Sequence, residues 1–238
     1  MGLDVAVGLL SYLDREDPEG AEFHRDVLRR LNDVLAEAGQ PPHLEPTGLP
    51  KSDYFEGQMW GYGGIHHVRR LAAYLALTEC LPEPCAYEEA SKDPILLNYY
   101  TQCDKYPVGK KSGLFGFFGR PVPPPRFAHL VIHSDCEGFY IPRELPFVLS
   151  DNSREQREGI GGFVGSSIAL ASEVRELADV LGIPAELDPE DDVVFENAES
   201  PIKEGLNWQR FGVETFVLTR LRRACELSER TGAAIVFT

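Results

Sequence analysis

The feature that most constrains the fold is a change in the spacing of the apolar residues along the chain. Apolar residues alternate with small or polar ones over Leu3–Leu9, which predicts a half-buried strand. Asp17 and Pro18 then supply a helix cap and a first-turn proline, and apolar residues follow at three- and four-residue steps as far as Gly39. This second pattern predicts an amphipathic helix over 18–38.

The same two periods recur in the rest of the chain, without the regular alternation of a βαβ protein. They predict an α+β fold: a single domain over 1–238, with a small mixed or antiparallel sheet packed against about four helices. The loop-rich stretches 40–63 and 81–125 leave room for a short strand and a short helix. The other predicted elements are helices at 64–77, 166–181 and 208–230, strands at 127–133, 138–141 and 233–237, a polar loop at 150–158 and an acidic, turn-like stretch at 187–199.

The charge balance restricts the partners that this chain can have. It contains 38 Asp and Glu against 23 Lys and Arg, a formal net charge of −15. A general nucleic-acid binder needs a basic face for the phosphates, whereas an acidic surface attracts basic proteins. The acidic run Asp188, Glu190, Asp191 and Asp192 adds to this attraction. The predicted partner is therefore a basic protein, with neither nucleic acid nor a membrane among the partners.

The first residues and the cysteines indicate the cellular compartment of the protein. Asp4 stands where a secretory signal would carry positive charge, and the apolar stretch to Leu10 is too short to span a bilayer. Five cysteines without an export signal indicate reduced thiols, and the single pair Cys80 and Cys85 lacks the second pair of a structural zinc site. The expected location is the cytoplasm.

The densest group of reactive side chains is His133, Asp135, Cys136, Glu137 and Tyr140. On a strand, His133 and Asp135 would share one face at roughly 7 Å, close enough to hold one metal ion or substrate. In the alternative interpretation Asp135 caps a turn and accepts a hydrogen bond from His133, and Glu137 is a turn residue. The sequence leaves both open.

A divalent metal site requires a third ligand. His66 and His67 are adjacent, and helical neighbours point about 100° apart, so they do not both face one ion. If the fold brings His67 beside His133 and Asp135, a site of two histidines and one carboxylate becomes possible. That arrangement would serve a metal-dependent hydrolase, with Glu137 or another carboxylate as the base.

Three further motifs each have two interpretations. Cys136 could be a nucleophile with His133 as base, which requires that the strand has ended, or a small buried hydrophobe. Gly159–Ser167 lacks the lysine of a phosphate-binding loop and is more simply a glycine-rich start to a helix, with Ser166 or Ser167 as its cap. The phenylalanines 115, 117 and 118 form either an exposed contact patch or part of the core.

Two segments resemble known proteins. His133–Pro142 reads H-S-D-C-E-G-F-Y-I-P and resembles a group of uncharacterised bacterial and plant proteins with an H-S-D-C-x-G-[FY]-Y-x-P segment. The end of the chain, Cys225–Phe237, is similar to some bacterial immunity-type proteins of polymorphic toxin systems. These resemblances imply no established activity and assign no catalytic residue.

The favoured hypothesis is an acidic cytoplasmic protein-binding module that resembles an immunity protein, masks a basic partner and needs no cofactor. One alternative is the metal-dependent hydrolase that uses His133 and Asp135. The other is a small-ligand sensor, with a pocket around Phe115 and Tyr140. The sequence leaves open whether the chain is an enzyme.

Overall fold

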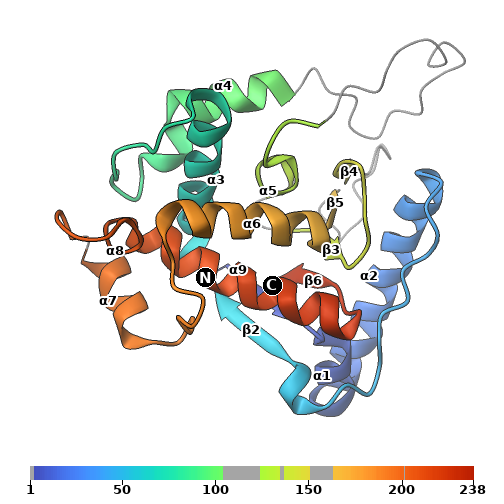
Figure 1. Cartoon of the computed structure of the whole chain (residues 1–238). Helices are drawn as coiled ribbons and strands as arrows, with labels where there is room; N and C mark the ends of the chain where they lie inside the picture. Colours follow the sequence, from blue (N-terminus) through green and yellow to red (C-terminus); the bar gives the residue numbers. More distant parts are fainter. Residues whose placement is uncertain (1–2, 104–123, 135–136, 151–162, 201) are drawn as a thin grey trace, which may run out of the picture.

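The structure of the chain is a computed structural model that describes residues 3–103, 124–134, 137–150, 163–200 and 202–238. This part forms one α+β domain with nine α-helices and a six-stranded mixed sheet, as the sequence predicts (Figure 1). The strands are β1 (Asp4–Val7), β2 (Phe55–Gln58), β3 (Phe139–Ile141), β4 (Leu149–Ser150), β5 (Phe163–Ser166) and β6 (Ile235–Phe237). The helices are α1 (Leu9–Glu16), α2 (Pro18–Glu37), α3 (Gly61–Thr78), α4 (Pro94–Cys103), α5 (Ala128–Ile132), α6 (Ser167–Leu181), α7 (Asp192–Glu199), α8 (Asn207–Arg210) and α9 (Gly212–Thr231).

The sheet brings the two ends of the chain together. Its strand order is β2-β1-β6-β3-β5-β4, so the last strand lies between the first strand and β3. Val5 on β1 pairs with Phe237 on β6, and the backbones of Asp4 and Thr238 exchange two hydrogen bonds of 3.1 and 3.0 Å. The pair β3–β5 is parallel and the other pairs are antiparallel, which makes the sheet mixed.

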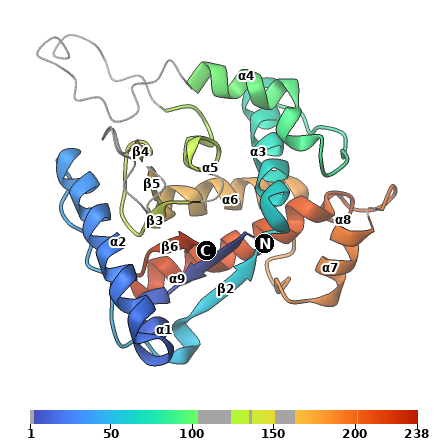
Figure 2. The ribbon, with the colours of Figure 1, turned by 180° about the vertical axis from the view of Figure 1, so that it is seen from behind.

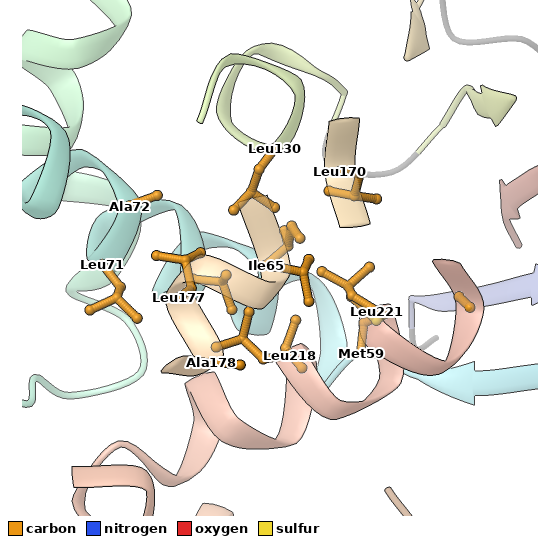
Figure 3. Packing of buried hydrophobic residues seen from close by; sticks show 14 of the residues in the cluster. Met59, Ile65, Leu71, Ala72, Leu130, Leu170, Leu177, Ala178, Leu218 and Leu221 are labelled. Carbon is orange, nitrogen blue, oxygen red and sulfur yellow. The ribbon is translucent and has the colours of Figure 1, made fainter. Parts of the chain in front are cut away.

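Helices cover both faces of the sheet, and each face has its own core. Alternate residues of a strand point to opposite faces, so Val5 and Val7 meet α3, α6 and α9, while Ala6 meets α1 and α2 (Figures 1 and 2). Figure 3 shows Leu177 of α6 and Leu221 of α9 in the larger core. Helix α9 runs through this core, and its residues from Gly212 to Leu221 are all buried.

The predicted strand over 127–133 is wrong, because the chain there forms α5. Phe127 adopts a left-handed conformation with φ 67°, and the half-buried Glu173 and the buried Arg69 hold the helix that follows. The Glu173 carboxylate accepts the backbone N–H groups of His129 (3.0 Å) and Leu130 (2.7 Å) at its first turn. At its last turn Arg69 donates to the carbonyl oxygen of Leu130 (3.0 Å) and to those of the two residues after α5. Contacts with α3 and α6 therefore select the helix.

Other differences are smaller. Helices α1 and α7 lie where the sequence analysis expected no helix, and Phe23, expected on the buried face of α2, is 58% exposed. The predicted cap of α6 is confirmed, since the Ser166 hydroxyl accepts the N–H of Ala169 at 3.0 Å. The segment 138–141 contains β3 as predicted, but β3 pairs with β5 and β6 rather than forming a hairpin. In the described ranges every helix is too short or too polar to cross a bilayer.

Candidate functional site

His133, the histidine of the predicted reactive cluster, lies in the interior together with His129. His133 is 2% exposed and its ring stacks on that of Tyr140, with ring centres 4.0 Å apart. Its two ring nitrogens lie 3.1 Å from the carbonyl oxygen of Phe139 and 3.2 Å from that of Ser134. Tyr140 is also buried, and its hydroxyl donates to the carbonyl of His129 at 3.0 Å. These groups tie α5 to the sheet.

The protonation of these histidines agrees with a structural role. Burial lowers the pKa of His133 to about 3 and that of His129 to about 4, so both rings are neutral near pH 7. The Nδ1 atom of His129 accepts the N–H of Ser166 at 3.1 Å, which leaves the proton on Nε2. Burial also raises the pKa of the Tyr140 hydroxyl, which stays protonated. No member of this group is poised for acid–base work near pH 7.

The remaining residues of the predicted site do not join this group. His67 pairs with the buried Glu214 (Nδ1 to Oε1, 3.3 Å) and stacks against Tyr87, whereas His133 has other neighbours. Glu137 is exposed, and its N–H donates to Ser134 Oγ. Within the described ranges no three His, Cys, Asp or Glu side chains could hold a metal ion. Asp135, Cys136, residues 159–162 of the glycine-rich stretch and the three phenylalanines 115, 117 and 118 lie outside those ranges.

The strongest concentration of exposed charge is residues 179–204, which we term the acidic segment. It covers the end of α6, the α6–α7 loop, α7 and the chain that follows, and it contains a single lysine, Lys203. On α7, Asp192, Glu196 and Glu199 are spaced four and three residues apart, so they lie along one side of the helix. Nine carboxylates of the segment are exposed: Asp179, Glu186, Asp188, Glu190, Asp191, Asp192, Glu196, Glu199 and Glu204.

Two arginines of α9, the buried Arg220 and the half-buried Arg222, contact this segment. Arg220 is 1% exposed, and its guanidinium lies over the rings of Phe216 (3.5 Å to the ring centre) and Phe195 (4.9 Å). It donates to Glu190 at 3.1 Å, and burial lowers its pKa to about 10, so it is still charged near pH 7. Arg222 donates to two backbone carbonyls of the α6–α7 connection, at 2.8 and 3.2 Å. These cations hold the backbone of the segment in place and leave most of its carboxylates free.

Glu196 and Glu199 do not stabilise α7, whereas Asp192 lies in its first turn, where a negative charge favours the helix dipole. In the described part of the chain, Asp192, Glu196 and Glu199 have no Lys, Arg or His partner. Like charges at this spacing repel, and a negative charge at a helix C-terminus, such as that of Glu199, opposes the helix dipole. Their charge is therefore available to another molecule.

A comparison with models of protein families identifies the family of this chain. A family model described as "Putative DNA-mimic protein" matches residues 1–237. The chain belongs to this family. Neither the curated proteins nor the solved structures gave a match.

Membership of a DNA-mimic family corrects one prediction from the sequence. The net charge predicts that nucleic acid has no part in the interactions of this protein. This prediction is wrong, because DNA mimicry implies partners that bind DNA. The basic protein partner that the net charge predicts is compatible with the family.

Part of the acidic segment is apparent in the sequence, but the helix within it is not. The run from Asp188 to Asp192 stands out in the sequence, whereas the acidic residues that dominate 187–199 predict turns there. The signal that could have revealed α7 is the spacing of Val194 and Ala198, which are four residues apart and both buried.

Proposed function

We propose that this protein binds a basic DNA-binding protein in place of DNA and thereby masks its DNA-contacting surface. The observation that carries the proposal is the acidic segment, in which exposed carboxylates line one side of α7 and pair with no cation among the residues that the structure describes. Family membership supports the same conclusion.

The spacing of these carboxylates suits lysine and arginine side chains arranged for DNA. An α-helix rises ~1.5 Å per residue, so Asp192, Glu196 and Glu199 follow one another at ~6 and ~4.5 Å along the axis of α7. Each strand of B-DNA places a phosphate about every 3.4 Å along its axis. A row of cations that follows a DNA strand can therefore find several carboxylates along α7.

The net charge of −15 acts at a longer range than these contacts. An acidic protein and a basic partner attract one another before they touch, which raises the association rate at low salt. Both the rate and the affinity should fall as salt screens the charges.

The similarity of the chain's end to immunity-type proteins stays a prediction, as does the cytoplasmic location. If it holds, the basic partner is a toxin that acts on DNA. No contact in the described part of the chain favours the metal-dependent hydrolase or the small-ligand sensor.

The test begins with proteins that a DNA-cellulose column retains from an extract of the cells that make this protein. They are passed over the immobilised chain, and the bound fraction is eluted with duplex DNA. The proposal predicts that duplex DNA releases the bound proteins and that each purified one competes with DNA for the chain. It is contradicted if the column retains nothing, or if duplex DNA does not displace what is bound.

A pair of matched variants shows whether the acidic segment is responsible. The first removes three charges from α7 (Asp192→Asn, Glu196→Gln and Glu199→Gln). The second removes three charges from α2 by the same kind of change, at the positions Glu22, Asp26 and Asp33. Both variants have the same net charge, so a difference in binding reports where the charge lies. Loss of binding in the α7 variant alone is the expected result.

A further inference from the structure

A hollow of about 380 Å³ opens beside the start of α3. It is lined by Gln58 at the end of β2, by Trp60 and Gly61, and by Tyr87 from the connection between α3 and α4. Two of its four lining residues are large aromatic side chains. We call it the Trp60–Tyr87 hollow.

The aromatic ring of Tyr87 is fixed in position although it is exposed. Its hydroxyl donates to the carbonyl of Trp60 (2.9 Å) and accepts the N–H of Gly63 (2.8 Å) at the first turn of α3. A Cβ atom on Gly63 would lie 2.2 Å from the Tyr87 ring, so only glycine lets the ring lie this close to the helix. The side chain nevertheless stays 42% exposed. A rigid, accessible aromatic ring loses little conformational entropy when it binds another molecule.

Trp60 occupies its place at a cost to the backbone. Trp60 and Gly61 have φ angles of 56° and 62°, in the left-handed region that glycine tolerates and a bulky residue does not. The half-buried Trp60 ring packs edge-on against Phe216, with ring centres 4.8 Å apart, and Phe216 in turn contacts Phe195 of α7 at 5.2 Å. The Phe216 ring thus lies between Trp60 at the hollow and Phe195 of α7, the helix within the acidic segment. Strained residues of this kind concentrate at functional sites.

Exposed carboxylates lie on the connection that carries Tyr87. Glu83, Glu88 and Glu89 are exposed on the same connection as Tyr87, and Arg210 lies 3.6 Å from Glu83. Behind the Tyr87 ring, the buried Glu214 pairs with His67, whose ring stacks on Tyr87 with ring centres 5.9 Å apart. Carboxylates beside and behind an aromatic pair favour a cation over an anion or an apolar group.

We propose that the Trp60–Tyr87 hollow receives an arginine side chain of the partner, an inference that rests on the proposed function. A guanidinium is flat, stacks on aromatic rings and needs hydrogen-bond acceptors, and the exposed amide of Gln58 supplies one. DNA-binding proteins use arginine to read the edge of guanine, a flat ring with acceptor atoms. The hollow would take the place of a base, as the acidic segment takes the place of phosphates.

The test is a titration of the ¹⁵N-labelled full chain, followed by NMR. The probes are two capped peptides of equal length and charge, in which glycine alternates with arginine in one and with lysine in the other. The indole N–H of Trp60 reports on the hollow and is assigned with Trp60→Phe, while the α7 amides report on the acidic segment. The expected result is that both peptides shift the α7 amides, and that the arginine peptide moves the Trp60 signal at about tenfold lower concentration than the lysine peptide.

Three variants distinguish the contribution of the aromatic rings to binding from their contribution to the fold. Tyr87→Phe keeps the ring but loses both hydroxyl hydrogen bonds, and it should keep the preference for arginine. Tyr87→Leu removes the ring and should abolish that preference. Trp60→Gly relieves the left-handed backbone and should also abolish it, as read from the Gln58 side-chain amide, without loss of the thermal transition.

The outcomes distinguish this inference from the function on which it rests. If the α7 amides respond but Trp60 does not, or if Trp60 responds equally to both peptides, the arginine site is overturned and the proposed function is untouched. A preference for arginine that survives in Tyr87→Leu and Trp60→Gly also overturns it. If Trp60 responds as expected while the α7 amides are silent, the arginine site is supported and the acidic segment is not the phosphate mimic.

Discussion

Two parts of this molecule are rich in acids, but they differ in how many of those acids pair with a cation at the surface. Residues 9–37, which form α1 and α2, contain eight carboxylates and four arginines, and the acidic segment 179–204 contains nine carboxylates and one lysine. On the first, Arg25 pairs with Asp14 and Arg29 with Asp26 at the surface. On the second, the arginines that contact the segment belong to α9, with Arg220 buried and Arg222 half-buried. The two parts lie at opposite ends of the molecule in Figures 1 and 2.

The difference shows that the position of the cations, more than the number of acids, decides where a partner can bind. A carboxylate that already pairs with a surface arginine offers a basic partner little, since the existing pair must be broken first. A carboxylate without a cationic partner keeps its charge outward when an arginine such as Arg222 instead holds the backbone of the segment from the inner side. The acidic segment has this second arrangement, which is the one a substitute for DNA requires.

The largest expected effect concerns the arginines of the two regions. Arg220→Ala should lower the free energy of unfolding by about 3 kcal/mol, because it empties the space over Phe195 and Phe216 and releases Glu190. Arg25→Ala, which removes only a surface ion pair, should cost less than about 1 kcal/mol. Urea unfolding measures both. Equal losses would mean that the buried arginines do not support the acidic segment.

The second effect is on binding. Loss of the three α7 charges should weaken the affinity for a purified DNA-binding partner by about thirtyfold, or ~2 kcal/mol, while the matched α2 variant changes it by less than about threefold. The α7 variant should also show a shallower dependence of affinity on salt, because fewer ion pairs form. Isothermal titration at several salt concentrations measures both quantities. Similar losses in the two variants would show that only net charge matters.

The third effect concerns pH and arises in neither acidic region. His129 and His133 stay neutral in the fold with pKa values of about 4 and 3, whereas an unfolded chain protonates them below about 6.5. Their contribution to stability is therefore present above pH 6.5 and is lost as the pH falls below it. Burial raises the pKa of Glu173 to about 7, so the fold binds a proton there between about pH 4.5 and 7 and offsets one histidine.

These three groups together should lower stability between pH 6 and 5 by about 1.4 kcal/mol per pH unit, which corresponds to one proton, and the buried His24, whose pKa burial also lowers, adds to the loss. Glu173→Gln should lower stability throughout and roughly double this slope, because it removes the offset. Urea unfolding at a series of pH values gives the slope, and an unchanged slope in the variant would show that Glu173 does not carry this proton.

The smallest effects should have opposite signs in the two acidic regions. Glu199→Gln should stabilise the protein by about 0.3 kcal/mol, because it removes repulsion from Glu196 and an unfavourable interaction with the helix dipole. Glu22→Gln should destabilise by a similar amount, because Glu22 lies 3.7 Å from Arg25 on α2. Thermal unfolding of the two variants side by side measures the signs. A destabilising Glu199→Gln would mean that α7 uses its charges internally.

The sequence predicts the elements whose apolar period is long. Strands β1 and β6 and helices α2, α3, α6 and α9 lie where the spacing placed them, because their buried stripes repeat over several turns or alternate without interruption. Helix α5 could not be predicted, since Phe127–Ile132 is a short apolar run whose conformation depends on Glu173 and Arg69, far away in the sequence. The central place of β6 depends on the same kind of distant contact.

The candidate site shows a similar division. The run from Asp188 to Asp192 is visible in the sequence, but nothing in the sequence shows that Arg220 and Arg222 lie beneath the acidic segment. The prediction of a reactive site at the histidines fails for the opposite reason. Reactive side chains stand out in a sequence, but their burial and their hydrogen bonds to the backbone are visible only in the fold.

Competition with DNA tests the central claim most directly. A fluorescent duplex bound to a purified partner is titrated with the full chain, and fluorescence anisotropy follows the release of the duplex. The account predicts that the wild-type chain and the α2 variant release the duplex completely, and that the α7 variant needs about thirtyfold more protein. A stable ternary complex of partner, duplex and chain would contradict the account, because the chain would then bind the partner away from the surface that DNA occupies.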